Sequence, residues 1–304
     1  MCWLYDVKNA AAAASGPDAG IQSPSVSAHS PWAPRRAFLQ LAGAAAVGAV
    51  LVPQAAQAQV SVGEASGLRK LVPAEMLEGS ARQQYAQVIA QARAQGALAP
   101  DHHPQLQRLR AMAHRLIPFA LPWNDRARQW QWEVNLIGSK KINAWCMPGG
   151  KIAFYTGILD QLKLTDDEAA MIMGHEMAHA LREHARERLA KSQATGIGLR
   201  LGAQLLGLGD LGGVAADVGT QLLTLKFSRE DETEADLVGL EMAARGAYAP
   251  QASVSLWQKM AAASGGEGGP SFLSTHPSGP DRIRKLQDNV PRVLPLYEQA
   301  RGRG

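Results

Sequence analysis

The chain has 304 residues, of which 46% are hydrophobic and 19% are charged. This length suffices for an amino-terminal leader and one domain with a single sizeable core. The formal net charge of +4 is small, and no basic run is interleaved with aromatic residues, which argues against nucleic acid as a partner. Of the two cysteines, Cys2 falls in the leader and Cys146 stands alone, so the mature chain has no intramolecular disulfide.

The first 58 residues have the pattern of an export signal. Arg35 and Arg36 begin a motif typical of twin-arginine export, a mildly apolar stretch covers residues 41–52, and small residues lead to Ala58. The apolar stretch is shorter than the roughly 20 residues that a membrane helix needs. We predict a signal peptide over residues 1–58, cleaved near Ala58, and a periplasmic mature protein. The alternative is a basic leader before a membrane anchor.

Two helices are predicted to open the mature domain. A linker is expected over residues 59–73, followed by a single domain over residues 74–304. Residues 74–95 are rich in Ala, Gln and Arg, and residues 104–117 place their apolar side chains on one helical face. Both stretches are therefore predicted to be helices.

Three short strands are predicted next. Residues 131–137 alternate in polarity, and residues 142–147 and 151–156 flank a Pro-Gly-Gly turn at 148–150. We expect a small antiparallel sheet. One of its edge strands is a candidate to bind an extended peptide by strand addition. The plainer interpretation is a sheet that only supports the following helix.

The next predicted helix contains the sequence His-Glu-Met-Ala-His. Thr165 and Glu168 form a capping box that starts this helix. Histidines four residues apart share a helix face, so His175 and His179 are candidate ligands of one Zn²⁺ ion. Glu176 lies beside them as a candidate base. The alternative for so short a motif is a surface helix with two solvated histidines.

A catalytic zinc site needs a third protein ligand and one open position. His184 lies five residues past His179, roughly 140° around a helix, so we interpret it as a solvated or structural histidine. A later helix, expected to begin at a cap formed by Ser228 and Asp231 and to end at Gly246, carries Glu232 and Asp236 on one partly buried face. Glu232 is the better candidate for the third ligand. The alternative is that these carboxylates belong only to an acidic helix start.

The remaining segments are less distinctive. Residues 192–226 are rich in glycine and leucine and are expected to form either a lid over the zinc cleft that supplies latency or touches a membrane, or a packed helical hairpin. Residues 251–263 and 281–287 are predicted to be helices. A glycine-rich loop between them leads to His276.

Four ordered elements resemble the gluzincin peptidases of the HtpX, BepA and LoiP type, a family that also contains the CAAX prenyl endopeptidase and the Oma-type proteases. The elements are the His-Glu-Met-Ala-His motif, the Glu-Thr-Glu-Ala-Asp sequence of residues 232–236, the hairpin of residues 143–150, and Thr-His-Pro at 275–277 followed by Asp-Arg-Ile at 281–283. With the predicted elements, the resemblance implies an α+β fold: a mostly helical, zincin-like metallopeptidase with a small antiparallel sheet beside the motif helix.

The resemblance also assigns the central chemistry. It implies that His175, His179 and Glu232 bind one Zn²⁺ per chain. It implies that Glu176 is the general base that takes a proton from a zinc-bound water.

Other residues receive supporting roles from the same resemblance. Asp236 would orient a zinc-binding histidine. His276 is the candidate donor to the tetrahedral oxyanion, and the alternative is a turn histidine before a proline. Arg282 is a weaker candidate for the same donor and for substrate binding, and Asn143 and Ala144 are expected to contact substrate.

The expected function is a zinc-dependent endopeptidase that hydrolyses unfolded or misfolded envelope proteins. One alternative is a zinc-stabilised periplasmic chaperone that binds its clients with little proteolysis. Another is a zinc hydrolase for a substrate other than protein. An intact Glu176 favours an enzyme over a chaperone, because a chaperone needs no base there. Twin-arginine export carries folded proteins, so we expect an enzyme that is latent or narrowly specific before export.

Overall fold

The computed structural model describes residues 60–194, 222–223, 225–263, 272–276 and 280–302. The predicted signal peptide lies outside these residues, as does most of the candidate lid. None of the helices within the described ranges combines the length and the apolar character that crossing a membrane requires.

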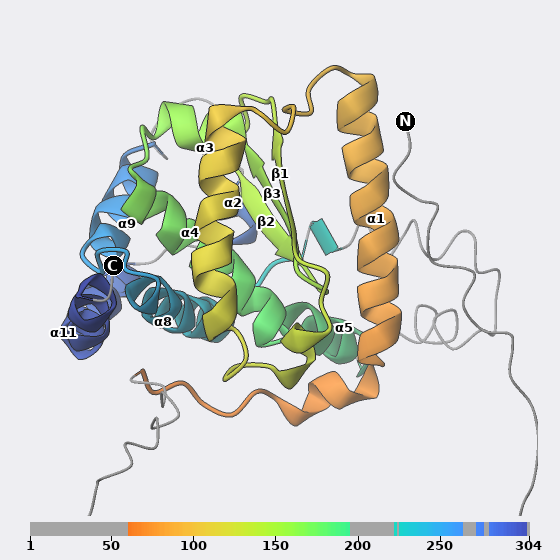
Figure 1. The fold of residues 1–304 in the computed structure, drawn as a ribbon. Helices are drawn as coiled ribbons and strands as arrows, with labels where there is room; N and C mark the ends of the chain where they lie inside the picture. Colours follow the sequence, from red (N-terminus) through yellow and green to blue (C-terminus); the bar gives the residue numbers. More distant parts are fainter. Residues whose placement is uncertain (1–59, 195–221, 224, 264–271, 277–279, 303–304) are drawn as a thin grey trace, which may run out of the picture. The chain divides into compact units, whose positions relative to one another are not determined.

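Helices pack on both faces of a small sheet (Figure 1). In chain order, the described elements are η1 (Gly67–Leu71), α1 (Ala74–Ala94), α2 (Pro104–Leu116), η2 (Ile117–Phe119), η3 (Asp125–Arg128), β1 (Glu133–Ile137), β2 (Ala144–Met147), β3 (Lys151–Tyr155), α3 (Thr156–Gln161), α4 (Asp166–Leu181), α5 (His184–Ala194), α8 (Arg229–Arg245), α9 (Ala252–Ala263), α10 (Phe272–Thr275) and α11 (Pro280–Arg301). The mostly helical α+β prediction is confirmed.

The sheet is mixed rather than antiparallel. Its strand order is β1-β3-β2, with β2 antiparallel to β3 as the Pro-Gly-Gly turn predicted. The prediction was wrong for β1, which runs parallel to β3. Residues 138–143 connect β1 to β2 across the position that β3 occupies, so that β3 lies between the two earlier strands. This order leaves β2 at an edge of the sheet, where it contacts α4.

Alternation along the strands divides the core. Ile152 and Phe154 point to one face of the sheet, where they join the main cluster with α2 and α4. Ala153 points to the other face and packs with Trp145 and with Tyr85 of α1. Both faces are therefore covered, and the zinc-motif helix lies in the main core.

The expected linker is a docked segment. Val60 is buried, and its backbone N–H donates to Glu241 at 3.0 Å. Further along, the Gly63 carbonyl accepts from Arg182, and Arg69 pairs with Glu183 at 2.8 Å. The segment thus contacts α8 and the residues that directly follow the motif helix.

The last helix is longer than predicted. The sequence indicated a short helix over residues 281–287, whereas α11 continues to Arg301 and contains Pro291 and Pro295. Each proline removes one backbone donor from the helix. Leu286 and Val293 are buried in the main core. Burial of this apolar face offsets the cost of the prolines, which local propensity alone does not capture.

Candidate metal centre

The motif helix α4 is buried along almost its whole length. The predicted capping box is present: the Thr165 hydroxyl accepts from the Glu168 N–H at 3.2 Å, and Glu168 Oε2 accepts from the Thr165 N–H at 2.9 Å. The two histidines and the glutamate of the motif are each at most 4% exposed. The alternative of a solvated surface helix is therefore wrong.

A second capped helix supplies the carboxylates. The Ser228 hydroxyl accepts from the Asp231 N–H, and Asp231 returns the bond to the Ser228 N–H, so α8 begins where the sequence indicated. Helix α8 packs along α4. Glu232 and Asp236, one turn apart, are buried against the motif helix.

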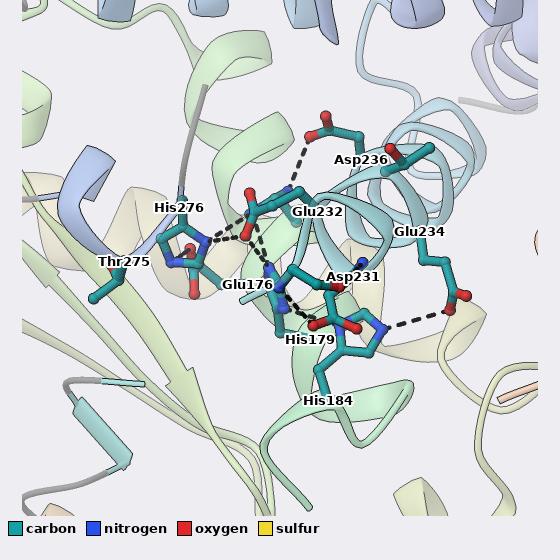
Figure 2. A network of polar contacts seen from close by, with 12 residues as sticks. Glu176, His179, His184, Asp231, Glu232, Glu234, Asp236, Thr275 and His276 are labelled. Atoms are coloured by element: carbon teal, nitrogen blue, oxygen red, sulfur yellow. Dashed lines mark hydrogen bonds and ion pairs between the residues drawn. The ribbon is translucent and has the colours of Figure 1, made fainter. Parts of the chain in front are cut away.

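Four side chains converge on one point. His175 Nε2 and His179 Nε2 are 3.1 Å apart. Glu232 places Oε1 3.5 Å from His179 Nε2 and Oε2 3.6 Å from His175 Nε2. With His276, these residues each offer a ligand atom within 4.8 Å of the others. Figure 2 shows the Glu232 carboxylate between His276 and His179.

His276 lies within the group of candidate ligand atoms, although it was expected only as a hydrogen-bond donor to the oxyanion. Its Nδ1 is 3.0 Å from Glu232 Oε1 and 3.3 Å from His175 Nε2. The ring stacks on Phe272 with the centroids 4.3 Å apart. Burial disfavours the charged ring, but the carboxylates of Glu176 and Glu232 outweigh it and raise the pKa of His276.

Asp236 lies where the sequence placed it, behind a candidate ligand. Its Oδ1 is 3.0 Å from His175 Nδ1, the ring nitrogen that points away from the ligand group. Such a contact fixes the ring and its tautomer. Burial alone would raise the pKa of Asp236, but the charge of Arg282 and the bond with His175 hold it below its usual value.

Arg282 does not contact the cleft as expected. Its Nε and Nη2 donate to Asp236 at 2.6 and 2.8 Å, and its Nη1 donates to Glu232 at 2.7 Å. The guanidinium carbon lies 3.4 Å from the ring centroid of Trp257. A side chain held by two buried carboxylates and an aromatic face is committed to the protein. These contacts favour a role in orienting the two carboxylates over the expected contact with substrate.

Of the two interpretations offered for His184, solvated or structural, its burial favours the structural one. The Nδ1 atom of His184 lies 2.9 Å from His179 Nδ1. The helix ends at Leu181, so the rotation of 100° per residue does not extend to position 184.

Glu176 presents a buried carboxylate oxygen that lacks a hydrogen bond within the described part of the chain. Its Oε1 is buried and has no hydrogen-bond partner among the described residues, with His276 Nε2 3.5 Å away. Burial raises the pKa of Glu176 above its usual value, although nearby histidines oppose the shift. An unsatisfied buried carboxylate oxygen is costly in a folded protein and indicates a group kept for a ligand or a reaction.

A cleft opens from this group along β2. Besides Glu176 and His179, the cleft is lined by the β2 segment, by residues of α4 and α5, by residues just before α8, and by the end of α10. These residues are Asn143, Ala144, Trp145, Cys146, Met147, Pro148, Ala180, Ala185, Leu222, Leu223, Leu225, Phe227, Thr275 and His276. Asn143 and Ala144, which were predicted to contact substrate, both line this cleft. The walls are mostly apolar and the metal-facing end is polar.

The group suits a divalent cation. Two imidazole nitrogens and a carboxylate oxygen form a donor set that Zn²⁺ commonly takes. The carboxylates of Glu232 and Asp236 share the guanidinium of Arg282, so two buried acidic side chains face one arginine here. Burial opposes ionisation of Glu232, but hydrogen bonds from His179 and His276 hold its pKa well below its usual range. A lowered pKa favours the ionised form, which is the form in which a carboxylate binds a metal.

A motif helix in the core, crossed by a helix that adds a carboxylate and bordered by an edge strand, defines the scaffold class of zincin metallopeptidases. The chain belongs to peptidase family M48, whose family model matches residues 103–290. M48 peptidases are zinc-dependent, in agreement with the donor set.

Several curated proteins are similar to this chain. The mitochondrial metalloendopeptidase OMA1 of Schizosaccharomyces pombe is 34% identical over 198 residues, which cover 64% of this chain and 56% of that protein. OMA1 of Saccharomyces cerevisiae is 32% identical over 177 residues, or 56% of this chain and 50% of the relative. The metalloprotease LoiP of Escherichia coli is 25% identical over 197 residues, or 64% and 73%. The chain thus spans about half the length of the two OMA1 proteins.

Proposed function

We propose that this protein is a zinc-dependent endopeptidase that cleaves extended segments of unfolded or misfolded proteins. The observation that carries the proposal is the buried Oε1 of Glu176, which lacks a hydrogen bond within the described residues and faces the cleft beside the His175, His179 and Glu232 group. We propose these three residues as the ligands of one zinc ion. The relatives' names, metalloendopeptidase and metalloprotease, support the same reaction class.

The chain's own residues account for the proton movements. When bound, zinc supplies the Lewis acid that polarises the peptide carbonyl and acidifies the attacking water. Glu176 Oε1 takes the proton from this water as the new C–O bond forms, and it passes the proton to the leaving amine as the C–N bond breaks. The raised pKa of Glu176 suits both transfers. His276, whose Nε2 lies 3.5 Å from Glu176, is proposed to donate to the developing oxyanion.

The edge of β2 is proposed to hold the substrate backbone. Tyr155 donates to the Asn143 carbonyl at 3.1 Å, so the backbone of Asn143 faces β3. Alternation along an antiparallel strand then directs the backbone groups of Ala144 and Cys146 to the open edge. The Ala144 N–H is already bonded to the Asn143 side chain at 3.0 Å, and the Cys146 N–H donates to the Glu176 carboxylate, which leaves the carbonyls of Ala144 and Cys146 for a peptide. Main-chain pairing favours unfolded segments and tolerates many sequences.

The place of action is proposed from the leader alone. The twin arginines at positions 35 and 36 support export to the periplasm, with envelope proteins as substrates. Replacing both arginines with lysine should trap the precursor in the cytoplasm, as judged by fractionation and immunoblotting. Normal export of that variant would refute the routing.

The decisive experiment is cleavage of unfolded casein by the purified protein, with and without a zinc chelator. We expect cleavage that the chelator abolishes and zinc restores. Glu176→Gln should retain zinc but lose at least about 100-fold in rate, the usual contribution of a positioned base. Casein binding without cleavage by the wild-type protein would favour the chaperone, and near-normal cleavage by Glu176→Gln would exclude Glu176 as the base.

A further inference from the structure

The two candidate ligand histidines have different outer partners. Each presents Nε2 to the ligand group and Nδ1 to the protein behind it. For His175 the outer partner is a carboxylate, that of Asp236, at 3.0 Å. For His179 it is another imidazole, that of His184, with the two Nδ1 atoms 2.9 Å apart. Figure 2 shows His184 between His179 and Glu234.

A metal bound at His179 Nε2 would determine where the protons lie in the series of contacts from His179 through His184 to Glu234. A neutral imidazole that binds through Nε2 carries its proton on Nδ1. His179 Nδ1–H therefore donates to His184 Nδ1, which must be the acceptor. The proton of His184 then lies on Nε2, which faces Glu234 Oε2 at 3.4 Å. In this arrangement His184 Nδ1 accepts from His179, and His184 Nε2–H points to Glu234.

The backbone turns His184 into this position. Helix α4 ends at Leu181 and α5 starts at His184. Between them Glu183 adopts a left-handed φ of 59°, which interrupts the helical path of the backbone. His184 consequently faces back to His179, and it is only 2% exposed.

The far side of His184 is held by an ion pair. Arg182 Nε donates to Glu234 Oε2 at 2.8 Å, the same oxygen that faces His184. Arg182 also donates to the Gly63 carbonyl of the docked amino-terminal segment. Phe227 stacks on His179 with the ring centroids 4.0 Å apart and covers the pair from the cleft side. The ring of His184 therefore has little freedom to turn.

We propose that His184 is a positioning residue for the metal centre, which holds His179 in the tautomer and orientation that binding through Nε2 requires. The inference rests on the metal site proposed above. Because its partner is a neutral imidazole, His179 gains orientation without the extra negative charge that Asp236 gives to His175. One ligand is thus backed by a charge and the other by a neutral acceptor.

The test compares two substitutions that place similar atoms at different points. In His184→Asn, the side-chain oxygen occupies roughly the place of Nδ1 and still accepts from His179. In His184→Gln, the amide lies near the place of Nε2, within reach of Glu234 but not of His179. His184→Phe keeps a ring without an acceptor. Asn124→Ala is the matched control, because it breaks the 2.9 Å bond to the Leu181 carbonyl at the end of the same helix without touching a ligand.

Two readouts are independent of proteolysis. Zinc affinity is measured by competition with a chromogenic chelator, and ligand geometry is read from the visible spectrum of the cobalt-substituted protein. Thermal unfolding of each metal-free variant reports whether it folds. We expect His184→Gln and His184→Phe to lose about 10- to 100-fold in zinc affinity and to alter the cobalt spectrum. His184→Asn should stay close to wild type, and Asn124→Ala should lose stability but not affinity.

The inference is overturned if folded His184→Gln binds zinc as tightly as wild type with an unchanged cobalt spectrum. It is also overturned if His184→Asn loses as much affinity as His184→Gln, because the acceptor at Nδ1 is then not the cause. Should the Phe variant not fold, the Asn and Gln pair decides alone. A wild-type protein that binds no zinc would instead refute the proposed metal site itself.

Discussion

Gly174 of α4 and Gly239 of α8 bring the two helix backbones into direct contact. A Cβ atom on Gly239 would lie 2.6 Å from the backbone nitrogen of His175, and one on Gly174 would lie 2.8 Å from the Gly239 carbonyl oxygen. Any side chain here would push the helices apart. The close crossing therefore allows the carboxylates of Glu232 and Asp236 on α8 to reach the histidines of α4.

We expect Gly239→Ala to destabilise the protein and to weaken zinc binding together. The added methyl group meets backbone rather than the end of a flexible side chain, so α8 must shift. Overpacking of this kind costs about 1–3 kcal/mol of unfolding free energy. Chemical denaturation and measurement of bound zinc on the same samples test the prediction.

Gly79→Ala is the matched control for this substitution. Gly79 lies within α1, and a Cβ atom there would meet nothing within 4 Å. Alanine should stabilise that helix by about 1 kcal/mol through propensity alone. If Gly239→Ala were as stable as wild type and bound zinc normally, the close approach would not be what positions Glu232.

Arg282→Met should be among the most damaging single changes in the molecule. It leaves Asp236 and Glu232 buried without their shared guanidinium, and removal of one partner from a buried ion pair costs about 3–5 kcal/mol. Arg284→Met on the same helix is the control. Its pair with Asp281 is exposed, so little change is expected. Equal unfolding free energies for the two variants would contradict the role assigned to Arg282.

Several features of the site could be predicted from local sequence. The capping boxes at Thr165 and Ser228 were correct because their hydrogen bonds lie within four residues. The position of Glu232 followed from the same capped helix and from the resemblance. Each of these inferences depends on spacing along one helix, which the sequence states directly.

Other features depend on contacts between distant segments. The parallel pairing of β1 with β3 depends on the path of residues 138–143, and no turn motif in the sequence predicts that path. The orientation of His184 depends on the left-handed backbone of Glu183, a conformation that a helical projection cannot include. The glycine pair at 174 and 239 carries no motif, and its purpose becomes visible only where the two helices cross.

Metal removal should lower the stability of the folded protein. A ligand that binds only the folded state stabilises it by about 2.7 kcal/mol when its free concentration is 100 times the dissociation constant. We therefore expect a chelator to lower the melting temperature of wild type and added zinc to restore it. Glu232→Gln, which removes the charged ligand, should show a much smaller response to zinc. An identical response of both proteins would place the metal elsewhere.

The acid side of the stability curve should depend on Glu168. This carboxylate is 2% exposed and accepts from the Thr165 N–H at 2.9 Å, from Ser255 Oγ at 2.7 Å and from Lys259 Nζ at 2.6 Å. Burial opposes its ionisation, but the bonds from Lys259, Thr165 and Ser255 prevail and lower its pKa below the usual 4.5. The folded state therefore binds the Glu168 proton less readily than the unfolded chain does.

The sign of the effect follows from linkage. A lowered pKa contributes stability that is fully present above the unfolded value near 4.5 and is lost as the pH falls through the lower folded value. At pH 7 we expect Glu168→Gln to unfold about 1.5–3 kcal/mol more easily than wild type, the usual contribution of hydrogen bonds to a charged group. The difference should shrink as the pH falls below 4.5. Glu64→Gln, at an exposed position, should match wild type throughout. A deficit in Glu168→Gln that stayed constant from pH 7 down to the acid transition would show that the lost charge is not its cause.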